Sequence, residues 1–162
     1  MSELMDETDA PFADAPTYHR VVEMLGGAKV LKSKIKTPLD VHDLLLRGLP
    51  GAALTHLVGT LALLRDPDSL EKAVGISLRT FQRRKTHPAM RLSHEQSGRT
   101  WKFAEMIAKA TAVLGSLAAA EQWLERPAIG LGQRRPIDLM ATAAGIDMVD
   151  TYLERIAYGV YT

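Results

Sequence analysis

The chain has 162 residues, of which 46% are hydrophobic and 6% aromatic, and its 20 basic residues nearly balance its 19 acidic ones. This length allows one domain of ordinary size or two small ones. The composition is typical of a soluble globular protein. Because cysteine is absent, a disulfide framework, a Cys zinc site and thiol catalysis are excluded. The N-terminus lacks a signal-peptide pattern, and no apolar run approaches the ~20 residues of a membrane span, so we expect a cytoplasmic protein without membrane attachment.

The small net charge conceals an uneven distribution of charged residues. Residues 1–16 contain five acidic and no basic residues, residues 17–94 contain thirteen Lys and Arg against six acidic residues, and residues 95–162 contain seven against eight. We therefore expect a polyanionic partner to bind the middle of the chain. Residues 1–16 are polar and include two prolines, which predicts a disordered acidic arm.

Three helices are predicted before residue 65. Apolar residues at helical spacing predict the first, from about Tyr18 to Leu25, and the Gly26–Gly27 pair ends it. Residues 29–36 are interpreted as a basic connector. The second helix is expected over residues 38–46 with a stop at Gly48, and the third over residues 51–61, after Pro50.

The segment from Leu70 to Lys85 predicts two helices joined by a tight turn. Gly75 can adopt the positive φ that such a turn needs, Ser77 can cap the second helix, and Phe81 is expected to face the core. The side chains left to face outward on the second helix are basic or hydrogen-bonding: Arg79, Thr80, Gln82, Arg83 and Lys85.

This outward chemistry suits the major groove of DNA. Arginines reach guanine edges or phosphates, glutamine can pair with an adenine edge, and Ser77 and Arg84 are expected near phosphate. An amphipathic pair with a solvated basic face is the alternative, because Glu71 and Arg84 fit the general helix-turn-helix pattern poorly. Turn glycine, cap and outward chemistry coincide here, which favours DNA binding. One such helix gives weak specificity, so we expect a homodimer that reads two half-sites about 34 Å apart.

A capping box of Ser93 and Gln96 begins a long predicted helix that reaches Leu114. It is apolar on two sides, which must be covered either by helices of the same chain or by a second chain. Glu105 and Lys109 have the spacing of a helix-stabilising ion pair.

Three further helices are predicted after residue 115. Ser116 caps one that ends at Leu124, and a glycine-rich loop follows over residues 129–135. A short helix is expected from 136 to 144, with Gly145 as its breaker. The last helix, over residues 146–157, is expected to bury Val149, Leu153 and Ile156.

A series of short motifs follows the chain in order: Leu25-Gly-Gly, Gly48-Leu-Pro, Gly75-Ile-Ser, Arg79-Thr, Arg83-Arg-Lys, Leu92-Ser, Trp123-Leu, the glycine-rich loop before Pro136-Ile-Asp-Leu, Gly145 and Arg155-Ile-Ala-Tyr-Gly-Val-Tyr. This series resembles the antitoxins of the Xre/MbcA/ParS group, over about residues 18–162. In that family Arg84, a poor fit to the general motif, is the expected residue.

The alanine and leucine content, the helix caps and the lack of alternating strand patterns predict an all-α fold. The resemblance implies that residues 17–92 form an Xre-like helix-turn-helix bundle and residues 93–162 a helical toxin-binding domain. It implies the antitoxin of a type II toxin–antitoxin system. The usual toxin partner is a RES-domain protein that consumes NAD, and the antitoxin would bind operator DNA of its own operon. No enzymatic activity, cofactor or metal is expected.

The final helix and tail are the predicted toxin-binding segment. Asp147, Thr151, Arg155 and Tyr158 share one helix face, opposite the buried one, and that face continues into an apolar tail. We hypothesise that the tail enters the toxin; folding back on its own domain is the alternative. The predicted toxin-binding residues are Thr151, Arg155, Tyr158, Gly159, Val160 and Tyr161.

Two other functions compete with the antitoxin hypothesis. An enzyme is disfavoured because the five histidines are scattered without metal-ligand spacing, and the glycines at 130 and 132 lack the full phosphate-binding pattern. A helix-turn-helix transcription repressor with a dimerisation or ligand-sensing C-terminal domain stays open, because residue chemistry alone does not separate it from an antitoxin.

Overall fold

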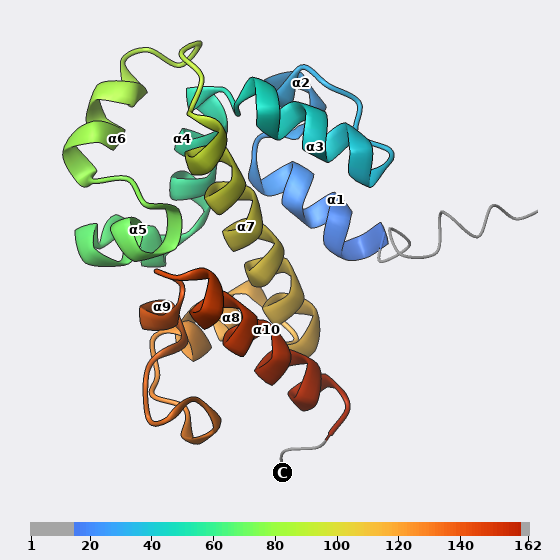
Figure 1. The fold of residues 1–162 in the computed structure, drawn as a ribbon, viewed down its shortest axis with the longest axis vertical. Helices are drawn as coiled ribbons and strands as arrows, with labels where there is room; N and C mark the ends of the chain where they lie inside the picture. The colour runs from blue at the N-terminus through green and yellow to red at the C-terminus, as the bar shows by residue number, and fades with distance from the viewer. Residues whose placement is uncertain (1–14, 160–162) are drawn as a thin grey trace, which may run out of the picture.

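The computed structural model describes residues 15–159, and within this range its secondary structure is helical with two isolated β-bridges, Pro50–Arg91 and Ala128–Arg134 (Figure 1). The all-α prediction is confirmed. The elements in chain order are α1 (Ala15–Met24), α2 (Gly27–Leu31), α3 (Pro38–Arg47), α4 (Gly51–Thr60), η2 (Ala62–Arg65), α5 (Pro67–Val74), α6 (Leu78–Lys85), α7 (His94–Leu114), α8 (Leu117–Leu124), η3 (Ile129–Leu131), α9 (Pro136–Leu139) and α10 (Ala143–Ala157).

The predicted arm and tail lie mostly outside the described residues. Residues 1–14 of the arm and the tail residues Val160, Tyr161 and Thr162 are not described. Ala15 and Pro16, which were assigned to the arm, belong to α1, so this part of the prediction was wrong.

Helix α7 is the centre of the fold and packs against α1, α3, α5, α8 and α10 (Figure 1). Its apolar sides are buried by these helices of the same chain: Phe103, Ala104, Ile107 and Ala110 have no exposed surface. Intramolecular packing therefore covers both sides as far as Ala110, with Thr111 and Leu114 half-buried at the end of the helix, and a dimer contact through the apolar sides of α7 is not needed.

The helix starts follow from local capping chemistry. Ser93 caps α7 in a capping box with Gln96, and Ser116 caps α8, as the sequence predicts. A second capping box begins α3, where Asp40 accepts hydrogen bonds from the backbone N–H groups of Lys36 and Thr37. These donors, Lys36 first, hold the pKa of Asp40 below its ordinary value.

The basic connector predicted over residues 29–36 was partly wrong. Its first part belongs to α2, a five-residue helix whose Leu31 is buried. Gly26 and Gly27 both have positive φ and form the turn between α1 and α2. Five residues are too few to show a helical repeat in the sequence.

The boundary between the last two helices was also predicted wrongly. Helix α9 ends at Leu139, and α10 begins at Ala143, three residues earlier than predicted, with Thr142 as its cap. Gly145 lies inside α10: the Thr142 hydroxyl accepts its N–H at 2.9 Å. A Cβ at this position would lie 1.9 Å from the carbonyl oxygen of Leu139. Gly145 thus permits close packing of α10 on the preceding turn and does not break a helix. Ile156, predicted to be buried, is half-buried.

The predicted Glu105–Lys109 ion pair is replaced by contacts that tie α7 to α10. The Lys109 ammonium lies 2.5 Å from the carboxylate of Asp150 and 3.7 Å from that of Glu154. Glu105 instead accepts a hydrogen bond from the Trp101 indole at 2.7 Å. Burial alone would lower the pKa of Lys109, but the hydrogen bond and charge of Asp150, assisted by Glu154, outweigh it and raise the pKa.

Candidate functional sites

The predicted helix-turn-helix is present as α5 and α6. Gly75 ends α5 with φ 72°, and its N–H donates to the carbonyl of Glu71 at 2.9 Å. Ser77 caps α6 by accepting the N–H of Thr80 at 3.2 Å. Ile76 and Phe81 are buried, which fixes the turn and the inner face of α6 to the core.

An arginine of the central helix α7, Arg99, contacts this turn and hydrogen-bonds to the backbone of α5 before it. The Arg99 guanidinium donates to the carbonyl of Lys72 at 2.7 Å, and a Cβ on Gly75 would lie 2.4 Å from its Nη1. Gly75 is therefore favoured for its positive φ, and any side chain at this position would also force the Arg99 guanidinium to shift.

The outer face of α6 carries most of the side chains predicted to bind DNA. Arg79, Gln82, Arg83 and Lys85 are exposed, and α6 contains no acidic residue. Thr80 is half-buried, and its hydroxyl accepts a hydrogen bond from the Ser77 hydroxyl at 3.0 Å. Their base and phosphate contacts stay predictions.

Arg84 differs from its neighbours because it has a structural partner. Its guanidinium donates to the carbonyl of Arg91 at 2.8 Å, and Arg91 in turn donates to the carbonyl of Gly48 at 2.6 Å. This chain of bonds fastens the end of α6 to the following loop and to the end of α3. The sequence predicted Arg84 near phosphate and did not indicate this positioning role.

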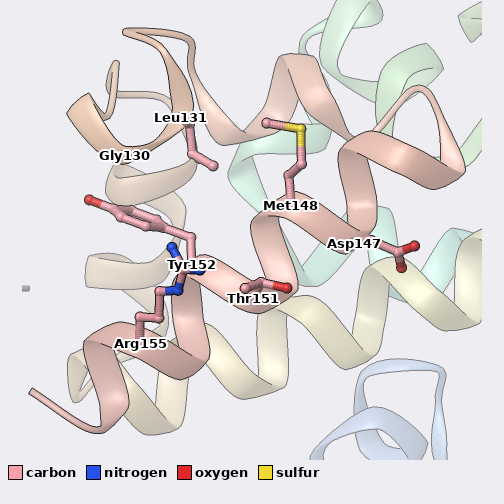
Figure 2. Close-up of a pocket in the computed structure, with 7 residues that line it drawn as sticks. All are labelled: Gly130, Leu131, Asp147, Met148, Thr151, Tyr152 and Arg155. Atoms are coloured by element: carbon pink, nitrogen blue, oxygen red, sulfur yellow. The ribbon is translucent and has the colours of Figure 1, made fainter. Parts of the chain in front are cut away.

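A second candidate site is a cavity of about 320 Å³ between η3 and α10, which we call the α10 cavity; the side of α10 that lines it is the α10 face (Figure 2). Figure 2 shows the side chain of Tyr152 between Leu131 of the loop and Arg155 of α10. The lining residues are Gly130, Leu131, Asp147, Met148, Thr151, Tyr152 and Arg155.

Aromatic packing shapes this cavity. The ring of Tyr152 stacks on that of Trp123 in α8, with centroids 6.0 Å apart and planes at 14°. A Cβ on Gly130 would lie 2.2 Å from the Tyr152 ring, so the loop passes this close only because residue 130 is glycine. Exposed apolar side chains flank the cavity: Met148 is 49% exposed and Ile129 83%.

The structure brings together only some of the predicted toxin-binding residues. Thr151 and Arg155 line the α10 cavity. Tyr158, which is 84% exposed, instead lines a different cavity, formed with the start of α1 and the end of α7. Gly159 follows with φ 68°, and Val160 and Tyr161 lie outside the described residues. Sequence reasoning missed Met148 and Tyr152, although Met148 lies three residues before Thr151 and Tyr152 three residues before Arg155 on the same helix.

Two protein-family models match the chain. The antitoxin Xre-like helix-turn-helix domain matches residues 40–105, and the antitoxin Xre/MbcA/ParS C-terminal toxin-binding domain matches residues 109–159. The chain belongs to the Xre-type antitoxins. Its helix-turn-helix is thus of a DNA-binding type, and its C-terminal part is of a toxin-binding type. No curated protein of similar sequence matches the antitoxin.

These matches favour an antitoxin over the alternative of a ligand-sensing repressor, and both families are antitoxin or regulator types and not known enzymes. Among residues 15–159 of the antitoxin, no three His, Asp or Glu side chains group as a metal site. In the same range no single helix is long and apolar enough to cross a membrane; α7 and α8 pass such a test only as a pair, by length and composition, with a bend of 112° between them.

An ionic cluster joins the two matched parts of the antitoxin. The Asp138 carboxylate of α9 accepts two hydrogen bonds from Arg135, at 2.8 and 2.9 Å, and one from Lys72 of α5 at 2.7 Å. Lys72 also pairs with Asp68 at 2.9 Å. The Arg135 hydrogen bonds, assisted by Lys72 against partial burial, lower the pKa of Asp138 to about 2. We call these four residues the Asp138 cluster.

Proposed function

We propose that this antitoxin silences a RES-domain toxin that consumes NAD, and that it represses its own operon by binding operator DNA as a homodimer. The observation that carries the proposal is the presence of two separate exposed faces on two matched domains. One is the polar outer face of α6, and the other is the α10 face, which lines the α10 cavity. The proposed domains are residues 15–92, which begin with α1, for DNA and residues 93–162 for toxin, preceded by the acidic arm.

DNA binding is assigned to the outer face of α6. Arg79, Gln82 and Arg83 would contact base edges or nearby phosphates, and Lys85 the backbone. An eight-residue helix reads few base pairs, which is why two copies on one operator are proposed. Because α7 is covered by its own chain, the dimer contact would come from another exposed surface.

Toxin neutralisation is assigned to α10 and the tail that follows it. A dinucleotide pocket offers flat surfaces for an aromatic ring and acidic groups for ribose binding or catalysis. Tyr158 or Tyr161 would occupy the former, and Arg155 would pair with the latter. Met148 and Ile129, which are exposed beside the cavity, would add apolar contact area. The toxin would then be blocked because its substrate site is occupied.

The test is co-expression with the neighbouring toxin gene, with cell growth and cellular NAD as readouts. Deletion of residues 158–162, or Arg155→Ala, is expected to restore toxicity and NAD loss while DNA binding persists. Arg126→Ala, which removes an exposed charge outside both faces, is the matched control. If the truncated antitoxin still rescues growth, the tail does not block the toxin. If NAD is unchanged while the toxin kills, the toxin is not of the NAD-consuming type.

A further inference from the structure

A third concave surface lies beyond the end of α6, outside both faces assigned to DNA and toxin. It is a cavity of about 250 Å³ whose lining includes three cationic side chains and no acidic one. The segments that form it are α2, the start of α4 and the loop after α6. Its lining residues are Lys29, Val30, Lys32, Pro50, Ala52, Pro88, Ala89 and Arg91.

Backbone hydrogen bonds hold this surface in shape. The N–H groups of Gly51 and Ala52, at the start of α4, donate to the carbonyls of Met90 and Pro88 at 2.9 and 3.1 Å. The bond from Arg91 to the Gly48 carbonyl fixes the loop at its other end. Because the loop carbonyls already occupy these α4 amides, the attraction for an anion comes from the lysine and arginine side chains.

The cavity continues the cationic row of α6. Pro88 is three residues beyond Lys85, which limits their Cα separation to about 10 Å. Figure 1 shows the loop that leaves α6 passing along the same edge of the molecule toward α4 and α2. Exposed cations therefore follow one another from Arg83 and Lys85 through Arg91 to Lys29 and Lys32.

We propose that this cavity binds backbone phosphates of the DNA duplex that flank the bases contacted by α6. The inference rests on the proposed operator binding by α6. Duplex DNA carries one charge for every ~1.7 Å of its axis when both strands are counted, so when α6 lies in the major groove the adjoining backbone presents phosphates all along such a row of cations. Lysines act as point charges that accept a phosphate in many orientations, which suits contacts that position the protein without reading sequence.

The experiment compares Lys29→Ala/Lys32→Ala with Arg126→Ala/Arg134→Ala, which removes the same charge from exposed positions far from α6 along the chain. The probes are the DNA fragment upstream of the antitoxin reading frame and a scrambled duplex of equal length. Dissociation constants are measured over a salt series. Each protomer loses two phosphate contacts, which lowers the slope of log affinity against log salt by about 1.8 per bound protomer, or about 3.6 for a homodimer, and weakens binding at least about tenfold near 0.15 M salt. The preference for the upstream fragment over the scrambled duplex stays constant.

The outcomes separate this inference from the proposed function. If the wild-type antitoxin binds neither duplex, DNA binding itself fails. If the wild type binds and the lysine variant matches the arginine control, the cavity is not a DNA contact. Loss of toxin affinity in place of DNA affinity would assign it to a protein interface and overturn the proposal. Lys29→Arg/Lys32→Arg keeps the charge and is expected to retain the wild-type slope, which excludes a folding defect as the cause.

Discussion

The face of α6 and the face of α10 are built in different ways. The α6 face depends on charge: exposed arginines, a lysine and a glutamine stand on a helix whose inner side is buried. The α10 face depends on close packing: Tyr152 stacks on Trp123, and Gly130 and Gly145 allow backbone approaches that a Cβ would prevent. A surface for a polyanion thus tolerates small shifts in structure, whereas a surface that fits a protein partner needs a fixed shape.

The largest expected effect comes from Gly145→Ala. The added Cβ would overlap the Leu139 carbonyl, so α10 must move away from the turn after α9. We expect the free energy of unfolding to decrease by about 2–4 kcal/mol, as measured by urea denaturation. The control is Gly98→Ala in α7, where no atom lies within 4 Å of the added Cβ, and which is expected to stabilise by about 0.5–1 kcal/mol. Equal stability of the two variants would contradict the packing role.

Gly130→Ala tests the α10 face more narrowly. Its Cβ would displace the Tyr152 ring from its place in the cavity wall. We expect toxin affinity to fall about tenfold, with a stability loss of about 1–2 kcal/mol, because an overpacked site forces a side chain to shift. Affinity for operator DNA is expected to stay unchanged. A parallel loss of DNA binding would show that the two faces are not built independently. Isothermal titration with toxin and with DNA makes the comparison.

Asp138→Asn tests the connection between the two regions. The pKa of Asp138 is about 2 in the folded protein against 3.8 ordinarily, so its stabilising effect is complete above about pH 4 and is lost as the pH falls toward 2. The full shift corresponds to about 2 kcal/mol, but partial exposure of the carboxylate reduces it to about 1 kcal/mol. We expect the variant to be less stable by this amount at pH 7, and the difference to disappear as the pH falls through about 2. A constant difference across this pH range would exclude the carboxylate charge as its cause.

Arg83→Ala is expected to have the smallest effect on stability, below about 0.5 kcal/mol, because the side chain is exposed. Operator binding is expected to weaken, and the slope of its salt dependence to decrease by about 0.9 for each lost phosphate contact, or about 1.8 for a homodimer that loses one in each half-site. Fluorescence anisotropy over a salt series measures both. Unchanged binding at every salt concentration would remove α6 from the DNA interface.

The sequence predicted most accurately the features that depend on contacts between residues close together in the chain. The turn at Gly75 and the caps at Ser77, Ser93 and Ser116 depend on local hydrogen bonds, and the structure confirms them. The exposed cations of α6 were predictable for the same reason, because helical spacing alone decides which side chains face outward once Phe81 is buried.

Features that depend on distant contacts were missed. Gly145 looked like a helix breaker because its close approach to Leu139 is visible only after α9 and α10 have packed. Lys109 pairs with Asp150 and not with the predicted Glu105, because α10 packs against α7 beside Lys109. Tyr158 was grouped with Arg155 from helical spacing, yet it lies at a different cavity because the end of α10 faces α1 and α7. Met148 and Tyr152 carry no motif, and they line the candidate cavity because the loop at Gly130 and Leu131 lies beside α10.

Because both matched domains share helix α7, both proposed functions depend on this helix staying intact. The match to the helix-turn-helix domain ends at residue 105 and the match to the toxin-binding domain begins at residue 109, both within this one helix. A protease that cuts α7 removes the common core of the two parts in a single event. On the proposed function, release of the toxin and renewed transcription of the operon then begin together, so a cell that resumes antitoxin synthesis can restore neutralisation without a separate signal.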